Sequence, residues 1–172
     1  MTRSELAQAI RDAAYLEGDF ILSSGRRSRY YLDKYLFCTD PALLREIARA
    51  LAAKLPPAFD VLAGVELGAV PLVTALALEA GRPFVIVRKQ AKDYGTSKLF
   101  EGRLAQGQRV VLVEDVLTTA AQAIDAAKRL RAFGAEVVKV LYVVDRQEGA
   151  SENLAAADLV AEPLFVKADL GI

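Results

Sequence analysis

The sequence of 172 residues contains no histidine, no tryptophan and a single cysteine, Cys38. The absence of histidine excludes, in their usual form, nucleophilic sites that pair it with serine or cysteine, and it excludes histidine-ligated zinc. A single cysteine can form neither an internal disulfide nor an all-thiolate zinc site, which suits a reducing cytoplasm. Any bound metal is therefore expected to be a hard cation held by oxygen, such as Mg²⁺.

The chain also has no excess of charge, because 22 basic residues balance 22 acidic ones. It therefore has no overall basic field that would hold nucleic acid or an anionic membrane. Its most apolar stretch, 61–80, is interrupted by Glu66, Pro71 and Glu79, and no run is long enough to predict a membrane span. With 53% apolar and 26% charged residues, the sequence predicts a globular cytoplasmic protein of one domain, 1–172.

Strand-like and helix-like patterns alternate from residue 40 onward. Predicted helices cover 4–16, 41–55, 71–80 and 119–133, and predicted strands cover 61–63, 84–87, 110–113 and 137–144. Continuous apolar strands that alternate with helices are typical of an α/β fold, with a mostly parallel twisted sheet and helices on both faces. The first residues, about 1–35, do not fit the alternation. A predicted hairpin over 19–33 suggests that they form a small N-terminal hood.

In open parallel sheets, ligands bind beyond the carboxyl ends of the strands. The strand at 110–113 leads into two carboxylates, Glu114 and Asp115, then into Thr118, Thr119 and a helix start. Backbone N–H groups at a helix N-terminus hold phosphate, whereas carboxylates suit sugar hydroxyls or a cation. The segment thus favours a ribose-5-phosphate site, and the plain alternative is an acidic strand end with threonine as helix cap.

Five stretches of the chain resemble those of a known family: 110–122, 88–102, 18–31, 64–71 and 144–146. The first, VVLVEDVLTTAAQ, is similar to the motif that binds phosphoribosyl pyrophosphate (PRPP) in type I phosphoribosyltransferases. The others are similar to the mobile basic loop, hood, pyrophosphate loop and orotate-binding segment of the orotate phosphoribosyltransferases within that family. The order and spacing agree over roughly residues 15–150.

The resemblance implies that orotate and PRPP, with Mg²⁺, give orotidine 5′-monophosphate and pyrophosphate. Orotate is already an anion, so the reaction needs no histidine base. Departure of pyrophosphate from an oxocarbenium-like sugar calls for positive charge on the leaving group and negative charge near the ribose. The expected cations are Arg88, Lys89 and the catalytic Lys92, and the expected anions are Glu114 and Asp115. A basic run in a loop is otherwise most often solvated surface.

The resemblance also assigns the remaining site residues. The residues expected to bind PRPP are Arg88, Lys89, Glu114, Asp115, Val116, Leu117, Thr118, Thr119, Ala120, Ala121 and Gln122. The pyrophosphate loop comprises Glu66, Leu67, Gly68 and Ala69, and a cis peptide bond is expected between Glu66 and Leu67. Orotate binding is expected at Thr118, Arg146, Tyr30 and Tyr31, and a hood contact to phosphate at Arg27. No direct protein ligand to the metal is expected, since PRPP carries the Mg²⁺. A homodimer is implied, in which the loop around Lys92 reaches the neighbouring site.

The chain departs from the family pattern at three places. Ala120, Ala121 and Gln122 replace the usual glycine and hydroxyl residues of the phosphate loop, and methyl groups there disfavour positive φ. Tyr94 replaces a loop histidine. Lysines that some relatives carry at positions matching Ser23 and Gly68 are absent.

Two other functions stay open. The first is a catalytically weak PRPP- or nucleotide-binding regulatory protein on the same fold, supported by the altered phosphate loop. The second is an enzyme of the same class that acts on another base. The basic loop argues against the first, and the hood together with Arg146 argues against a purine enzyme.

Overall fold

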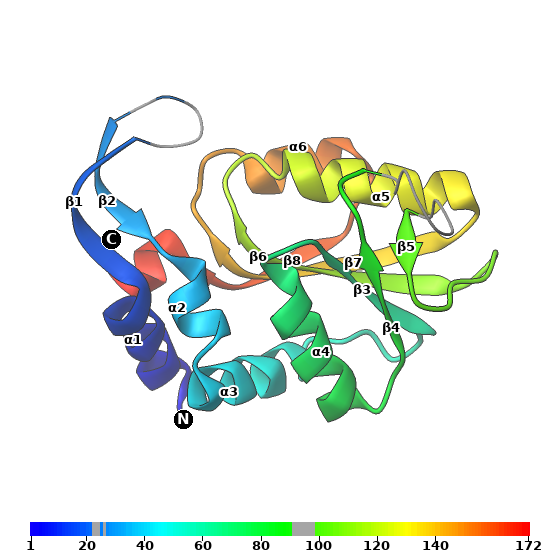
Figure 1. The fold of residues 1–172 in the computed structure, drawn as a ribbon, viewed down its shortest axis with the longest axis horizontal. Helices are drawn as coiled ribbons and strands as arrows, with labels where there is room; N and C mark the ends of the chain where they lie inside the picture. Colours follow the sequence, from blue (N-terminus) through cyan, green and yellow to red (C-terminus); the bar gives the residue numbers. More distant parts are fainter. Residues whose placement is uncertain (22–24, 26, 91–98) are drawn as a thin grey trace.

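A central sheet of six strands organises the molecule (Figure 1). The computed structural model describes residues 1–21, 25, 27–90 and 99–172. The strand order is β5-β4-β3-β6-β7-β8, with β3 Val61–Val65, β4 Phe84–Val87, β5 Phe100–Glu101, β6 Arg109–Leu117, β7 Glu136–Asp145 and β8 Ala161–Val166. All neighbours are parallel except β4 and β5. The predicted mostly parallel sheet is therefore confirmed.

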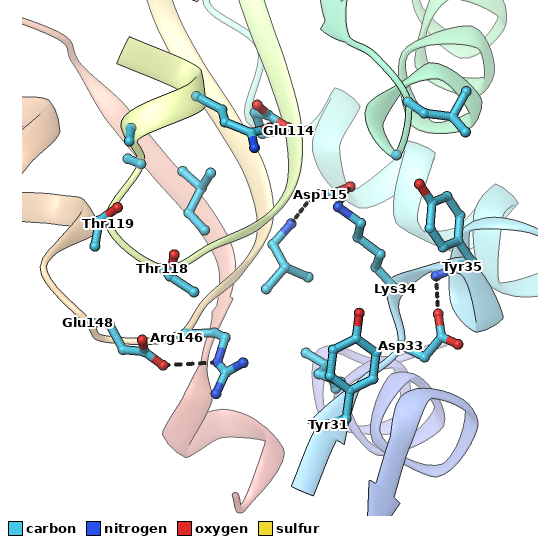
Figure 2. Close-up of a pocket in the computed structure, with 18 of the residues that line it drawn as sticks. Tyr31, Asp33, Lys34, Tyr35, Glu114, Asp115, Thr118, Thr119, Arg146 and Glu148 are labelled. Atoms are coloured by element: carbon cyan, nitrogen blue, oxygen red, sulfur yellow. Dashed lines mark hydrogen bonds and ion pairs between the residues drawn. The ribbon is translucent and has the colours of Figure 1, made fainter. Parts of the chain in front are cut away.

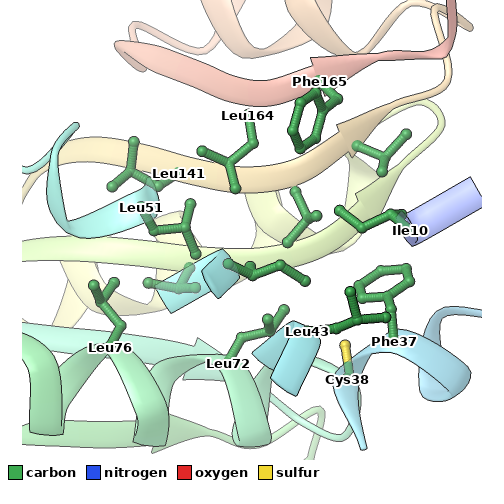
Figure 3. Packing of buried hydrophobic residues seen from close by; sticks show 14 of the residues in the cluster. Ile10, Phe37, Cys38, Leu43, Leu51, Leu72, Leu76, Leu141, Leu164 and Phe165 are labelled. Atoms are coloured by element: carbon green, nitrogen blue, oxygen red, sulfur yellow. The ribbon is translucent and has the colours of Figure 1, made fainter. Parts of the chain in front are cut away.

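Helices cover both faces of this sheet (Figure 1). One face packs against α1 (Arg3–Ala14), α3 (Pro41–Ala52) and α4 (Ala69–Ala80), and the other against α5 (Ala121–Phe133) and α6 (Ala150–Ala156). Neighbouring residues of one strand face opposite layers: Val111 and Val113 of β6 join the first layer, and Val110 and Leu112 the second. Figure 3 shows the first layer, where apolar side chains from helices and strands interlock. The predicted α/β class is confirmed.

Local signals in the sequence place the helix ends well. Thr2 and Glu5 form the capping box of α1, and Asp40 caps α3, whose first residue is Pro41. Gly81 ends α4 with φ 62°. Two predicted helix starts were less accurate. Helix α4 begins at Ala69, two residues before its predicted start, and α5 begins at Ala121, two residues after its predicted start.

The N-terminal segment forms a separate antiparallel hairpin of β1 (Tyr15–Ile21) and β2 (Arg27–Leu32), as predicted. The short helix α2 (Lys34–Cys38) follows it, and the turn η1 (Lys167–Leu170) near the end of the chain packs against α1. Neither of these, nor β5, α6 and β8, is predicted from the sequence. In the described ranges no helix combines the length and the apolar character needed to cross a membrane.

Strand β6 is longer than the apolar run that predicts it. It continues through Leu117, which pairs with Asp145 of β7. Glu114 and Asp115 therefore lie inside the last part of β6 rather than after it. The reason is that β7 offers backbone partners to β6 beyond the apolar run, and ladder pairing does not require apolar side chains.

Candidate active site

A pocket of about 980 Å³ opens at the carboxyl ends of β6 and β7, where the sheet meets the N-terminal segment. Figure 2 shows its two sides. We call residues 114–122, from β6 to the start of α5, the sheet wall, and residues 31–35, from β2 to α2, the N-terminal wall. The rest of the lining includes residues 66–68, Lys89, Arg146 and Glu148. The sheet and the hairpin thus enclose one site.

Two acidic side chains of the sheet wall are buried, with Glu114 6% and Asp115 3% exposed. Burial, and then the charge of Asp115, raises the pKa of Glu114 to about 8, so this carboxyl is mostly protonated at neutral pH. Asp115 Oδ1 accepts a hydrogen bond from the backbone N–H of Val116 at 2.5 Å, and Asp115 Oδ2 lies 2.8 Å from the ammonium of Lys34. In the free protein Asp115, rather than both acids, therefore supplies the charge opposite a cation.

The other end of the sheet wall is a helix N-terminus. Ala120 precedes α5, and among the described residues no side chain caps this helix. The first backbone N–H groups of α5 are thus free of intrahelical partners beside the exposed Thr118 and Thr119. Asn153 Nδ2 donates to the carbonyl of Thr119 at 3.0 Å and holds the turn. These donors suit a phosphate group.

Ala120 has φ 63°, the left-handed conformation that its methyl group was expected to disfavour. The methyl group makes this conformation costly, and the turn from β6 into α5 adopts it nonetheless. An L-residue in this region costs about 1–2 kcal/mol relative to a right-handed one. The turn into α5 therefore has a left-handed residue at Ala120 without glycine.

The predicted pyrophosphate loop, residues 66–69, contributes residues 66–68 to the lining of the same pocket. The peptide bond between Glu66 and Leu67 is cis, as the resemblance implies. Glu66 Oε1 accepts a hydrogen bond from the backbone N–H of Lys89 at 2.5 Å, which joins this loop to the end of β4. Gly68 lines the pocket, whereas Ala69 is fully buried at the start of α4.

Arg146 closes the pocket on the β7 side. Its Nη2 donates to the hydroxyl of Tyr30 at 3.0 Å, and its Nε lies 3.2 Å from Glu148 Oε1. The guanidinium carbon lies 5.2 Å from the centre of the Tyr30 ring, which stacks on Tyr15 at 5.5 Å. Arg146 is thus held in a fixed position with its side chain facing the cavity (Figure 2).

The basic loop contributes Lys89 to the pocket lining. Arg88 instead lies 3.7 Å from Glu101 Oε1, outside that lining. Lys92 and Tyr94 lie outside the described residues. Arg129 of α5 donates from Nη1 to the carbonyl oxygens of Arg88 and Lys89, both at 2.6 Å, and so fixes the point at which the chain leaves β4.

The structure brings most of the predicted site residues together. In the described part of the chain the pocket lining includes Glu66, Leu67, Gly68, Lys89, Glu114, Asp115, Val116, Leu117, Thr118, Thr119, Ala120, Ala121, Gln122, Arg146 and Tyr31. Four described residues of the prediction lie outside that lining: Ala69, Arg88, Tyr30 and Arg27. Of these, Tyr30 contacts Arg146, and Arg27 is exposed beside Asp19 at 3.4 Å.

Two residues near the site were not found from the sequence. Lys34 reaches Asp115 from α2, and Arg129 supports the end of β4 from α5. The motifs contain neither residue, and both act on segments far away in the sequence. A helix of five residues offered little periodic signal from which to place Lys34.

The fold and this pocket define a phosphoribosyltransferase. A family model described as the phosphoribosyl transferase domain matches residues 39–167. The relatives are more specific. The orotate phosphoribosyltransferase of Natronomonas pharaonis is 52% identical over 99% of this chain and 98% of its own length, and that of Pyrococcus abyssi is 46% identical over 98% and 94%. The chain belongs to the orotate phosphoribosyltransferase family.

A solved structure supports the same assignment. The orotate phosphoribosyltransferase of Mycobacterium tuberculosis in complex with PRPP is 36% identical to this chain and superimposes with a TM-score of 0.82, covering 99% of both chains.

Proposed function

We propose that this protein transfers the ribose-5-phosphate of PRPP to orotate, giving orotidine 5′-monophosphate and pyrophosphate. The observation that supports this most is the sheet wall, where a buried carboxylate and an uncapped helix N-terminus line one pocket with Arg146. The carboxylate and the helix N-terminus suit a sugar phosphate, and the guanidinium of Arg146 suits an anionic base. Relatives at 46–52% identity over nearly the whole chain bear the same enzyme name.

In this proposal the N-terminus of α5 and the hydroxyls of Thr118 and Thr119 bind the 5′-phosphate of PRPP. The donors are fixed before the substrate arrives, so little reorganisation is needed on binding. Asp115 accepts hydrogen bonds from the ribose hydroxyls and favours positive charge on the ribose as the bond to pyrophosphate breaks. Glu114, mostly protonated, can also donate a hydrogen bond to a ribose oxygen.

Pyrophosphate leaves on the side of residues 66–69. Lys89, which lines the pocket, supplies positive charge for it. Arg88 and Lys92 remain predicted contacts of the leaving group, with Lys92 as the catalytic cation. The described residues contain no group of three acidic or thiol side chains that could hold a metal ion. We treat Mg²⁺ as part of the substrate, bound by oxygens of PRPP, as the family resemblance implies.

The orotate carboxylate pairs with the guanidinium of Arg146, whose planar fork matches it. Tyr31 lines the pocket and can lie against the pyrimidine ring, and Thr118 can donate to the base. Tyr30 acts through Arg146, because its hydroxyl accepts from that guanidinium. The hood contact of Arg27 to phosphate stays a prediction, which requires Arg27 to leave Asp19.

The remaining parts of the proposal concern assembly and location. A homodimer in which the loop around Lys92 serves the neighbouring site stays a prediction from the family resemblance. The assignment of one domain, 1–172, with a hood over about 1–35, also stays a prediction, made from the chain length and the sequence pattern. A cytoplasmic location is proposed from the single, buried Cys38.

Two alternatives from the sequence are not favoured. The altered phosphate loop was the main support for a weak binding protein, yet its backbone reaches the left-handed turn through Ala120. Action on another base is disfavoured because the guanidinium of Arg146, which faces the cavity, matches a carboxylate that adenine, hypoxanthine and uracil lack.

The test is the loss of orotate absorbance when the purified protein is mixed with PRPP and Mg²⁺. Uracil, adenine and hypoxanthine serve as parallel substrates. Turnover of orotate alone is expected. Turnover of another base instead would refute the assignment of the base, and binding of PRPP without turnover of any base would favour the regulatory alternative.

A further inference from the structure

Lys34 occupies an unusual position for a cation. It is the first residue of α2, a position where a helix N-terminus disfavours positive charge, and it lines the pocket. Its partner is Asp115, whose Oδ2 lies 2.8 Å from the Lys34 ammonium across the pocket (Figure 2). Burial lowers the pKa of Lys34, but the charge and hydrogen bond of Asp115, with smaller contributions from Tyr35 and Glu114, together raise it above its ordinary value. The contact joins the N-terminal wall to the sheet wall.

This contact leaves Asp115 with no oxygen that is free of partners. Its Oδ1 accepts from the backbone N–H of Val116, and its Oδ2 faces Lys34. A carboxylate has about four acceptor sites, so Asp115 can accept from a ribose hydroxyl while both contacts persist, and it is freer to do so when the mobile partner gives way. The backbone N–H of Val116 belongs to β6 and cannot move freely, whereas a lysine ammonium sits on a flexible stem of four carbons.

Gly68 determines where Lys34 can go. A Cβ atom at Gly68 would lie 1.8 Å from Asp115 Oδ2 and 3.0 Å from Lys34 Cε. The backbone of Gly68 has φ −65°, which every residue can adopt, so the space and not the conformation requires glycine here. The Lys34 stem therefore lies directly against the loop of residues 66–69, where the leaving group is proposed to bind.

We propose that Lys34 is a binding residue for the diphosphate of PRPP: its ammonium turns from Asp115 to the diphosphate when that group enters the pocket, and Gly68 keeps the space for this exchange open. The inference rests on the proposed function and adds a cation from the hood side to the leaving-group site. The product orotidine 5′-monophosphate has no diphosphate and gains nothing from the exchange.

That difference gives a selective test by calorimetry. In Lys34→Met, the affinities for magnesium pyrophosphate and for PRPP are expected to fall at least about tenfold, since a charge-assisted contact is lost. The affinity for orotidine 5′-monophosphate is expected to stay within about threefold. Lys128→Met, an exposed lysine on α5, is the matched control and leaves all three affinities unchanged.

Equal losses for PRPP and orotidine 5′-monophosphate would overturn the proposal, since they would mean that Lys34 only holds Asp115 in place. Unchanged affinities would also overturn it. If Lys34→Met does not fold, Lys34→Gln, which lacks the charge but keeps a donor, replaces it. A wild-type protein that binds pyrophosphate but does not turn over orotate would refute the proposed base and leave the role of Lys34 intact.

Discussion

The two walls of the pocket are built in opposite ways. The sheet wall is one continuous stretch, 114–122, whose acids are 6% and 3% exposed in the centre of the sheet. The N-terminal wall comes from a hairpin and a five-residue helix, and its Tyr31 and Tyr35 are 39% and 41% exposed. A rigid buried strand can hold charges in fixed positions, whereas a small appended segment supplies partners that can move. The comparison suggests that the first wall fixes the sugar and the second adjusts to it.

One contact joins the two walls directly, and a second joins residues next to them. Lys34 meets Asp115 at 2.8 Å, and Tyr30, beside the N-terminal wall, accepts a hydrogen bond from Arg146 at 3.0 Å. Loss of the buried Asp115 charge should therefore disturb chemistry most, changes at the connecting contacts should disturb binding, and changes at Glu114 and Ala120 should disturb mainly stability.

The largest effect is expected from Asp115→Asn in the sheet wall. The change removes the buried charge that favours a positive ribose and leaves Lys34 without its anion. We expect kcat/KM for PRPP to fall about 100-fold or more, because electrostatic groups at a reacting centre are worth this much. The orotate absorbance assay measures it. Asp12→Asn, on the exposed side of α1, is the control, and near-normal activity of Asp115→Asn would remove this residue from the site.

The connecting contact of Arg146 gives the second effect. Arg146→Lys keeps the charge but loses the planar fork, so the KM for orotate is expected to rise at least about tenfold. Tyr30→Phe removes only one hydrogen bond to this guanidinium, worth roughly 1 kcal/mol, and should raise the KM about fivefold. Steady-state kinetics with varied orotate distinguish the two. A larger effect from Tyr30→Phe than from Arg146→Lys would contradict the proposed order of roles.

The third effect concerns stability and pH. The pKa of Glu114 is raised to about 8 in the folded protein, from an ordinary value near 4.5. Between these values the folded state binds a proton that the unfolded state has lost, so stability falls as pH rises, by at most about 1.4 kcal/mol per pH unit, and levels off above the folded pKa. Glu114→Gln removes this contribution.

Thermal unfolding from pH 5 to pH 9 measures that difference. The unfolding temperature of Glu114→Gln, relative to that of the wild type, is expected to rise with pH up to about pH 8. Above pH 8 the difference between the two unfolding temperatures is expected to stay constant. A constant difference across the whole range would show that Glu114 is not protonated in the folded protein.

The smallest effect is expected at Ala120. Its φ of 63° suits glycine better than alanine, so Ala120→Gly should raise the free energy of unfolding by up to about 1 kcal/mol. Ala132→Gly, on the exposed side of α5, lacks this strain and should lower it by up to about 1 kcal/mol. Denaturant unfolding compares them. Destabilisation by both substitutions would mean that the left-handed turn at Ala120 is not strained.

The sequence by itself determined the α/β class, the cores of the long helices and strands, and the sheet wall. These follow from apolar periodicity, from caps such as Thr2 and Asp40, and from a motif whose residues are neighbours along the chain. Contiguous residues keep their spacing whatever the rest of the fold does, so their chemistry follows from the order of the residues alone.

Only the tertiary structure decided which distant residues complete the site. The sequence showed Gly68 as a place where a lysine is missing, but not that Lys34 reaches the same space from α2. It also did not show that Arg129 holds the end of β4, or that burial keeps Glu114 protonated. Such features depend on through-space distances and on exclusion of water, which arise only when segments far apart in the chain pack together.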